Sequence, residues 1–566
     1  MSGMRWLFPD AADHERMKTL AGKLKVPPIV ARILLNRGIS TFEESRTFLR
    51  PSLDDLCDPF AMRDMGRAVD RICQAIEGKE KVMVYGDYDV DGVTAVAMLM
   101  RFLKTCGVET TFYIPDRLSE GYGISNTGIQ QAKQAGVNLI ISVDCGIKAF
   151  DEVALALDLG IDMIVTDHHE TGADLPRALA VLDPKRPDCE YPFKELAGVG
   201  VAYKLIQGVS LRLGRQEEDP LEYLDLVALG STADIVPLWG ENRILVKYGL
   251  QRITSSNNLG IQALIEMVGL KGKELGTGQV VFILAPRLNA GGRMGDARRG
   301  VRLLTTEDLS EAKDLAQVLE EENRKRREID DRTFEEALEM IDRNIDLDNT
   351  WTIVLASSHW HPGVIGIVAS RIIERFYRPT ILISYDGPVG KGSARSIQGF
   401  DLYDALQECK DCLIGFGGHK YAAGLKIERD KLEQFRMCFD RITKKMLTQE
   451  QLAPILRIDG EISLSEIDDR LYRLLNLFAP FGPQNMKPIF VSRNVEVVGT
   501  PRIVGNNHLK FKVRQNMRIF EAIGFGMGNL LYRIAPGEPN LDMAYVLEKN
   551  EWEGNANFQL RIRDLK

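Results

Sequence analysis

The sequence predicts an α/β protein in which two α/β units are joined by a long helix and followed by a β-rich C-terminal segment. Apolar strands alternate with helices through residues 80–185. A charged stretch without proline or glycine fills residues 306–344, and short alternating strands begin near residue 454. The chain has 566 residues, of which 45% are hydrophobic and 27% charged. This composition excludes a disordered or collagenous protein and leaves room for roughly three or four domains.

The first 75 residues predict short amphipathic helices, at KTLAGKLK, PPIVARILLNRG, FEESRTFLR and MGRAVDRICQAIEGK. After them come the strands KVMVYGD, VETTFYIPD, VNLIISVD and DMIVTDHH, separated by helices such as VTAVAMLMRFLKTCG and FDEVALALDLG. Continuous Val, Ile and Leu strands between helices are typical of a parallel sheet that is buried on both faces.

The remaining chain predicts three further parts. Residues 195–270 are mostly helical, and residues 306–344 form a solvated helix between two domains, because their apolar positions are too sparse for a coiled coil. TIVLASS, GVIGIVASRIIERF, PTILISYD and LYDALQECKD then repeat the α/β pattern. The last strands alternate apolar and polar residues, which favours a small barrel or a sandwich.

Charge and cysteine content limit the class of protein. Lys and Arg total 72 against 80 Asp and Glu, a net charge of −8. That balance argues against a nucleic-acid coat protein, although an enzyme needs only a local basic groove. The eight cysteines are too scattered for a disulfide framework. Cys409 and Cys412 form a single CxxC, for which we favour two buried apolar residues on a helix over a zinc site with four ligands.

The N-terminus carries acids by Asp10 and lacks the apolar core of a signal peptide. No apolar run approaches the ~20 residues of a membrane span. We therefore expect a cytoplasmic protein that does not contact a membrane.

The densest chemical signal is VMVYGDYDVDGVTAV, which spaces Asp87, Asp89 and Asp91 two residues apart. In extended backbone these side chains point the same way, and they lie where a strand gives way to a helix. Ligands bind at that edge of open α/β sheets. Three crowded carboxylates repel one another unless a cation neutralises them. Taken alone, the motif fits a solvated turn or a calcium loop equally well.

Two more predicted strands end in the same kinds of residue. Asp144 follows one strand, and Asp167, His168 and His169 follow the next. Asp234 follows a helix and could close the cluster. Carboxylates with imidazoles suit Mn²⁺ or Mg²⁺ better than a metal that prefers thiolates. The ligands suffice for two ions, the arrangement that hydrolyses phosphate esters. The two histidines alone would more often be structural, but three successive strand ends make accident the weaker explanation.

These motifs resemble the DHH phosphoesterase superfamily and, within it, the RecJ family of bacterial single-strand-specific 5′→3′ exonucleases. GDYDVDG, SVDCG, TDHHE, GVGVAYKL, STADIVPL, APRLNAGGRMGDA, KGSARS and FGGHKYAAG follow the family's order over nearly the whole chain. The implied fold is a parallel-sheet DHH domain, a long linking helix, a second α/β DHH-associated domain and a C-terminal OB-like β-barrel. The implied boundaries are 1–75 for the N-terminal helices, 76–270 for the catalytic domain, 271–345 for the arginine-rich segment and linking helix, 346–450 for the DHH-associated domain and 451–566 for the OB fold.

The resemblance also implies roles for individual residues. The metal ligands are Asp87, Asp89, Asp91, Asp144, His168, His169 and Asp234, and they hold Mn²⁺ or Mg²⁺, two ions in all. Among them Asp89, Asp91, Asp144, His168 and His169 are catalytic, whereas Asp167 orients the histidines. The 5′-phosphate pocket consists of Arg117, Arg293, Ser393, Arg395 and His419.

Two basic segments agree with a nucleic-acid substrate. APRLNAGGRMGDARRGVR holds five arginines against one acid, and the planar fork of Arg suits phosphate. Arg298 and Arg299 could equally neutralise nearby acids. Near the C-terminus, Lys510, Lys512 and Arg514 share one strand face, and Phe520 or another exposed aromatic residue could stack on bases. The alternative for that face is an ordinary solvated surface.

We therefore expect a single-stranded-DNA-specific 5′→3′ exonuclease that releases 5′-mononucleotides by metal-dependent hydrolysis, in DNA repair and recombination. A phosphodiesterase for short oligonucleotides is the alternative, and a catalytically inactive DNA-scaffold protein of the same fold is a third hypothesis. The family suggests single-stranded DNA, a helicase and a single-stranded-DNA-binding protein as partners of a monomer.

Overall fold

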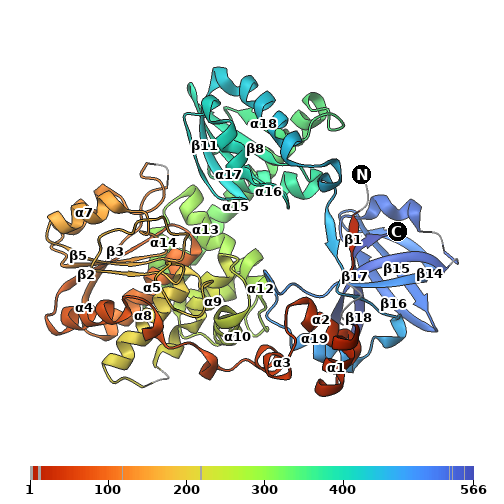
Figure 1. The fold of residues 1–566 in the computed structure, drawn as a ribbon, viewed down its shortest axis with the longest axis horizontal. Coiled ribbons are helices and arrows are strands. Elements are labelled where there is room, and N and C mark those ends of the chain that lie inside the picture. The colour runs from red at the N-terminus through yellow and green to blue at the C-terminus, as the bar shows by residue number, and fades with distance from the viewer. Residues whose placement is uncertain are drawn as a thin grey trace. The chain divides into compact units, whose positions relative to one another are not determined.

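A computed structural model describes residues 4–9, 14–117, 119–216, 219–534, 536–537, 539–552 and 555–566 (Figure 1). It contains two compact units, one of residues 9–322 and 459–565 and the other of residues 4–8, 323–458 and 566. The boundary falls inside α15 (Leu309–Asn344), a helix of 36 residues, as the charged stretch predicts. Within the described ranges, no helix has both the length and the apolar character that crossing a bilayer requires.

The first unit is built on a five-stranded sheet in the order β3-β2-β4-β5-β6, in which every pairing is parallel. Its strands are β2 (Lys81–Gly86), β3 (Glu109–Tyr113), β4 (Leu139–Val143), β5 (Asp162–Thr166) and β6 (Ala180–Leu182). The helices around it are α4 (Met65–Glu77), α5 (Val90–Thr105), α6 (Asn126–Gln134), α7 (Phe150–Asp158), α8 (Gly198–Arg212), α9 (Leu224–Ala233), α10 (Gly240–Thr254) and α11 (Leu259–Met267).

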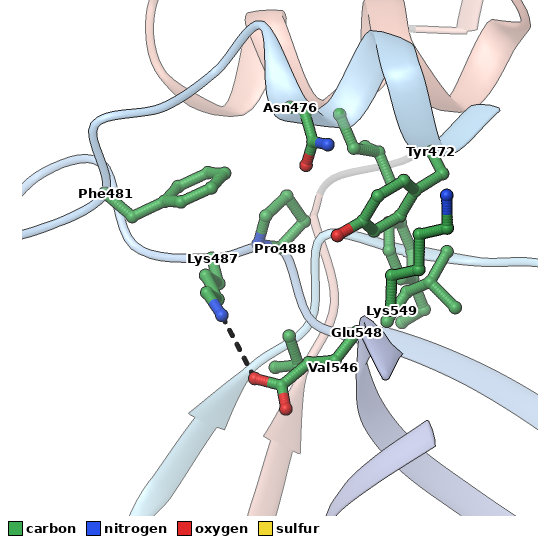
Figure 2. Close-up of a pocket in the computed structure, with 11 residues that line it drawn as sticks. Tyr472, Asn476, Phe481, Lys487, Pro488, Val546, Glu548 and Lys549 are labelled. Carbon is green, nitrogen blue, oxygen red and sulfur yellow. Dashed lines mark hydrogen bonds and ion pairs between the residues drawn. The ribbon is translucent and has the colours of Figure 1, made fainter. Parts of the chain in front are cut away.

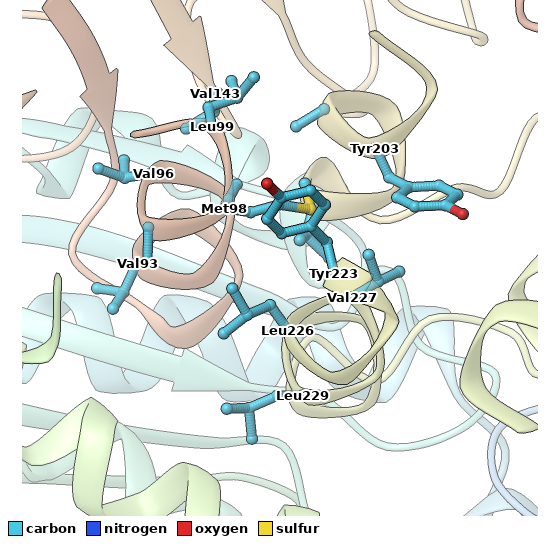
Figure 3. Packing of buried hydrophobic residues seen from close by; sticks show 14 of the residues in the cluster. Val93, Val96, Met98, Leu99, Val143, Tyr203, Tyr223, Leu226, Val227 and Leu229 are labelled. Carbon is cyan, nitrogen blue, oxygen red and sulfur yellow. The ribbon is translucent and has the colours of Figure 1, made fainter. Parts of the chain in front are cut away.

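Side-chain alternation along the strands divides the core of this sheet in two. Val82 and Val84 of β2 join the larger apolar cluster with α5, α8 and α9, whereas Met83 and Tyr85 face α6 and α7. Figure 3 shows residues of α5 and α9 packed in the larger cluster. Both faces are therefore buried, which explains the continuous apolar strands of the sequence.

A run of short helices follows and ends in α15. It comprises α12 (Thr277–Gln279), the π-helix η5 (Val280–Leu284), α13 (Ala285–Met294) and α14 (Arg298–Thr305). Residues 277–294 are continuously helical, and they carry the arginine-rich segment past the loop that follows β2.

The C-terminal strands form a closed five-stranded barrel, because β14 pairs with both β15 and β17. The five strands of the barrel are β14 (Phe490–Val504), β15 (His508–Gln515), β16 (Arg518–Gly524), β17 (Pro539–Trp552) and β18 (Asn555–Leu565). The short β13 (Gly460–Glu461) pairs with β14 outside the closed ring. The N-terminal helices α1 (His14–Leu24) and α2 (Pro28–Asn36), together with α19 (Asp469–Asn476), contribute to the apolar core of the barrel, and α3 (Phe42–Leu49) packs against it. The sequence predicts the four N-terminal helices but not this attachment.

The second unit contains a mixed sheet in the order β10-β11-β9-β8-β7, in which only β7 and β8 are parallel. Its strands are β7 (Ile353–Ser357), β8 (Thr380–Asp386), β9 (Val389–Arg395), β10 (Gly415–Gly418) and β11 (Ala422–Glu428). Its helices are α16 (Ile365–Phe376), α17 (Leu402–Glu408) and α18 (Leu432–Met446), and β1 (Arg5–Leu7) pairs with β12 (Ile455–Arg457). The predicted fold class is confirmed in both units.

Candidate metal centre

Seven acids and histidines gather at the carboxyl edge of the parallel sheet. Asp87 directly follows β2, Asp144 follows β4, and His168 and His169 lie just beyond β5. Three groups have ligand atoms within 4.8 Å of one another: Asp144, His168 and His169; Asp91, His168 and Asp234; and Asp87, Asp89 and Asp144. The structure therefore brings together all the residues that the sequence nominates as ligands.

The geometry behind the Asp87, Asp89 and Asp91 motif differs from the expectation. Asp89 is the N-cap of α5, where its Oδ1 accepts the N–H groups of Asp91 and Gly92 at 3.0 and 3.2 Å. Asp91 lies in the first turn of that helix, so the three residues do not alternate along an extended strand and that prediction is wrong. They converge because the chain turns into a helix at Asp89.

Asp91 is held in place by a second helix. Its carboxylate accepts the N–H groups of Gly198 and Val199, at the start of α8, at 2.7 and 2.8 Å. Such bonds to helix N-terminal amides favour an ionised carboxylate. Gly198 also makes room for a neighbour, since a Cβ there would lie 2.6 Å from the Cβ of Asp144.

Asp144 adopts a left-handed backbone conformation, with φ of 59°. Aspartate tolerates that region better than most residues, but it remains uncommon outside glycine and costs free energy. The turn directs the buried Asp144 carboxylate at the histidines, with its Oδ1 at 3.1 Å from His168 Nε2.

Asp167 orients the histidine pair from behind. Its Oδ1 accepts His169 Nδ1 at 2.7 Å and the backbone N–H of His168 at 2.8 Å, while its Oδ2 accepts the N–H of Ile147 at 2.9 Å. Burial alone would raise the pKa of Asp167, but the bond to His169 and the charge on that ring lower it to about 2. Burial likewise opposes a charge on His169, yet its bond to Asp167 raises its pKa to about 9.

The sequence does not single out Tyr122, which contacts the same histidine. Its hydroxyl lies 3.3 Å from the ring nitrogens of His169 and 3.2 Å from the backbone oxygen of Asp144. The sequence signal that could have identified Tyr122 is its position between two glycines, Gly121 and Gly123, both of which have positive φ. Glycines on both sides allow a tight turn that exposes the tyrosine side chain.

The cluster is electrostatically unfavourable without a cation. Burial, together with repulsion from neighbouring carboxylates, raises the pKa of Asp87, Asp144 and Asp234 well above the usual range and that of Asp91 to about 7. Burial, together with the charge of His169, lowers the pKa of His168 to about 3. Each shift reflects the removal of a charge from water next to other charges.

Several atoms of the cluster that could bind a metal have no hydrogen bond. In the described part of the chain, Asp87 Oδ1, Asp144 Oδ1 and His168 Nε2 are buried without a hydrogen bond, although the last two lie 3.1 Å apart. Buried polar atoms are normally satisfied, so converging exceptions point to a missing ligand. Carboxylate oxygens with imidazole nitrogens are the donor set that Mn²⁺ and Mg²⁺ accept, so the residues present fit these cations.

Two of the residues predicted to hold a 5′ phosphate lie beside this cluster. The guanidinium of Arg117 lies over the ring of Tyr88 at 5.0 Å. Burial and the charge of Asp87 raise the pKa of Tyr88 to about 12, and the positive charges of Arg117 and Arg293 oppose that shift. Both arginines thus place positive charge at the loop between β2 and α5.

The other three predicted pocket residues belong to the second unit. Ser393 and Arg395 end β9, and Arg395 Nη1 donates to Ser393 Oγ at 3.1 Å. Gly366 lies against both, since a Cβ there would come within 2.8 Å of each side chain. His419 lies in the turn between β10 and β11, where its N–H donates to the oxygen of Ala422 at 2.8 Å.

Most arginines of the arginine-rich segment are paired with acids. Arg298 binds Asp296, which precedes it, and Arg299 binds Glu322 of α15. Arg287 and Arg302 also reach α15, where they pair with Glu320 and Glu311 at 2.6 and 2.7 Å. The ion pairs of Arg298 and Arg299 are those expected from local charge neutralisation.

Comparison with known proteins agrees with this arrangement. The DHH family N-terminal domain matches residues 81–231, the DHHA1 domain residues 349–445 and the RecJ OB domain residues 458–564. A single-stranded-DNA-specific exonuclease RecJ of Bacillus subtilis (strain 168) is 41% identical over 566 residues, which cover 100% of this chain and 71% of that protein.

The chain belongs to the RecJ family.

Solved structures of this family contain divalent cations. RecJ from Thermus thermophilus in complex with Mn²⁺ matches with a TM-score of 0.84 at 30% identity, covering 99% of this chain and 79% of that one. The same protein with Mg²⁺ matches with a TM-score of 0.79 at 28% identity, covering 99% and 78%. The acidic clusters of this RecJ-family chain could hold such ions. The domain boundaries inferred from the sequence stay predictions.

The RecJ OB domain carries the predicted basic face, but its charge is partly neutralised. Lys510, Lys512 and Arg514 lie on one face of β15, opposite buried Leu509 and Val513. Lys510 pairs with Glu521 at 3.1 Å and Arg514 with Glu496 at 2.6 Å, and these acids come from the adjacent strands.

Phe520 does not provide the stacking surface that the sequence suggests. It is 8% exposed and belongs to the barrel core, so Phe520 is wrong for that role, and another exposed aromatic residue stays a prediction. An exposed aromatic cluster lies nearby instead, where the rings of Phe525 and His508 are 5.0 Å apart and Arg561 covers Phe525 at 5.1 Å.

The CxxC residues are buried in the second unit, as expected. Cys409 and Cys412 belong to its apolar core, and Cys409 Sγ lies 3.3 Å from Cys438 Sγ. Cys409 caps α17 and Cys412 lies in a 3₁₀ turn, so the two are not on one helix as predicted. Neither belongs to a metal-competent group in the described ranges.

Proposed function

We propose that this protein hydrolyses single-stranded DNA from its 5′ end and releases 5′-mononucleotides, with divalent cations, two in all, at the seven-residue cluster. The observation that carries the proposal is that cluster: carboxylates and imidazoles that converge, with three buried atoms, Asp87 Oδ1, Asp144 Oδ1 and His168 Nε2, that have no hydrogen-bond partner. The RecJ relatives, which are named as single-stranded-DNA-specific exonucleases, support the choice of substrate. Without a cation, burying so many charged side chains at one place would destabilise the folded protein.

Each residue around the cluster has a definite task in this proposal. Gly198 and Val199 fix the Asp91 carboxylate, and Asp167 fixes the ring of His169. Divalent cations bound there would act as Lewis acids and would lower the pKa of a bound water, so that it could ionise near neutral pH. Asp89, Asp144 and His168 complete the set to which we assign catalysis, with Asp91 and His169.

The 5′ polarity rests on a phosphate site. We assign the terminal phosphate to Arg117, Arg293, Ser393, Arg395 and His419. The support is the positive charge beside the loop that carries Asp87 and the pairing of Arg395 with Ser393, a guanidinium fork next to a hydroxyl donor. A bound 5′ phosphate would set the register, so that one nucleotide leaves per cycle.

The barrel accounts for single-strand binding without sequence preference. Lys510, Lys512 and Arg514 lie on one face, as in proteins that follow the phosphate backbone. We further propose that the protein acts as a cytoplasmic monomer in DNA repair and recombination. A helicase and a single-stranded-DNA-binding protein would supply its substrate.

Cleavage assays with labelled single strands test this function. With Mn²⁺, a 5′ label should appear as mononucleotide at the earliest times, and blunt duplex should stay intact. Asp144→Ala should abolish cleavage while retaining single-strand affinity and the thermal midpoint. Asp158→Ala, which removes an exposed acid at the end of α7, should cleave normally. Faster cleavage of a dinucleotide than of a long strand would favour the short-oligonucleotide alternative.

A further inference from the structure

We propose that a groove formed by α10, η5 and the segment after α19 binds the single strand on its way to the metal centre. In this groove a base stacks on Phe282 and a backbone phosphate pairs with Lys247. The proposal rests on the proposed function and names a binding site that it does not require. Every residue involved lies in the first unit.

The groove has a volume of about 900 Å³. It is lined on one side by α10, on a second by the start of the helical run 277–294, and on a third by the chain between α19 and the barrel. Phe282 and Phe481 supply aromatic surface, and Lys247 supplies positive charge, whereas Lys487 is paired with Glu548. Glu274 is the one acid among the lining residues. Gln251, Gln279 and Asn476 add amides that can meet base edges of any sequence.

Phe282 is unusually exposed for an aromatic residue, at 79%. It lies in the π-helix η5, whose wide turn has a local cause. Pro286 has no N–H, so it cannot bond the carbonyl four residues earlier, which is that of Phe282. The helix widens here, and the N–H of Ala285 instead donates to Val280, five residues back. Single π-turns of this kind are frequent at functional sites.

Lys247 is a cation without a counter-ion. It forms no ion pair among the described residues, and burial together with the neighbouring charge of Arg243 lowers its pKa. The neighbouring Arg243 does not place an acid near Lys247 either. Its guanidinium donates to backbone oxygens of Phe48 and of residues 477–480. A phosphate at Lys247 would relieve this excess of positive charge, whereas an apolar peptide would not.

The groove continues toward the barrel. Asn476, Phe481 and Lys487 also line an adjoining pocket of about 250 Å³ that reaches residues 546–549 of β17. Figure 2 shows this pocket, with the Lys487 ammonium paired with Glu548 at 3.0 Å. A strand held by the barrel therefore has a continuous path to Phe282, along surfaces that carry both aromatic rings and charge.

The same helical run also reaches the metal centre. Asn289 Oδ1 accepts the N–H of Val90 at 3.2 Å, and Gly292 lies against the backbone of Tyr88. Phe282 and Arg293 are eleven residues apart in the sequence, which is about 16 Å at 1.5 Å per residue. A base stacked on Phe282 therefore belongs to a strand that extends beyond the nucleotides at the metal centre, so a dinucleotide bound there does not use this site.

Equilibrium binding tests the groove directly. With EDTA present to prevent cleavage, fluorescence anisotropy of a labelled 20-nucleotide oligo(dT) should show about tenfold weaker binding for Phe282→Ala, as loss of one base stack implies. Phe282→Tyr should bind like the wild type. Phe150→Ala, on the exposed surface of α7 and outside the groove, is the matched control and should also bind normally.

Salt dependence tests the phosphate contact. Lys247→Gln should reduce the slope of log affinity against log salt by about 0.7, the value for one phosphate of a single strand. Phe282→Ala should leave that slope unchanged while lowering affinity at every salt concentration.

Kinetics separate this proposal from the proposed function. Phe282→Ala should raise KM for a 20-nucleotide strand and leave dinucleotide cleavage unchanged. If wild-type protein cleaves DNA and Phe282→Ala matches it in affinity and KM, the groove does not bind the strand. If wild-type protein neither binds nor cleaves single strands, the proposed function itself fails.

Discussion

Replacing Gly198 by alanine perturbs the metal centre without removing a ligand. The added Cβ would lie 2.6 Å from the Cβ of Asp144 and 2.7 Å from its Oδ1. Carbon atoms in contact normally stay about 3.5–4.0 Å apart, so the Asp144 side chain must move by roughly 1 Å. A displacement of that size at a reacting centre costs on the order of 100-fold in rate. We expect Gly198→Ala to lower kcat about 100-fold.

Gly200→Ala is the matched control, because it makes the same substitution in the same helix. There the three atoms nearest to the new Cβ all belong to the side chain of Leu196, at 3.3 Å or more. That variant gains helix propensity of up to about 1 kcal/mol and should remain active. Cleavage of labelled single strands, Mn²⁺ titration calorimetry and thermal unfolding should be measured for both. Equal activity and equal Mn²⁺ affinity of the two variants would refute the packing argument.

Three further predictions concern other parts of the molecule. Glu241 and Lys204 form a buried ion pair at 2.6 Å, so Glu241→Ala should lower the free energy of unfolding in urea by about 3–5 kcal/mol. Adding Lys204→Met should recover most of that loss. A loss below about 1 kcal/mol for Glu241→Ala contradicts the prediction. On the barrel, Lys512→Gln should reduce the salt slope of DNA binding more than Arg514→Gln, because Arg514 already pairs with Glu496. Finally, the raised carboxyl pKa values of the metal centre, about 7 for Asp91, mean that the metal-free protein loses stability as pH rises from about 4 through those values. Mn²⁺ must displace protons, so its stabilising shift in Tm should be larger at pH 8 than at pH 6, and an equal shift would count against the cluster as its site.

The sequence predicts the metal centre well because its signal is local. Each strand of a parallel sheet ends at the same edge, so Asp144 and His168 are placed together by topology alone. Topology alone does not place Asp91. Its position depends on the start of α8, more than 100 residues later, whose amides hold its carboxylate. Strand periodicity cannot contain that information.

The barrel shows the same limit. Alternation along β15 predicts that Lys510 and Arg514 share a face, and they do. The acids that neutralise them belong to neighbouring strands, and the sequence of one strand does not determine its register with its neighbours. The attachment of α1 and α2 to the barrel core joins residues more than 400 positions apart, with no local signal. The prediction for Phe520 fails for a similar reason, since its burial depends on closure of the barrel.

We infer that divalent cations bind among the seven acids and histidines at the edge of the parallel sheet. Anomalous diffraction from crystals soaked in Mn²⁺ would locate these ions. We expect manganese peaks enclosed by Asp87, Asp144, His168 and the other ligands. Saturating Mn²⁺ with no peak at that edge, or with manganese only at other sites, would contradict this inference.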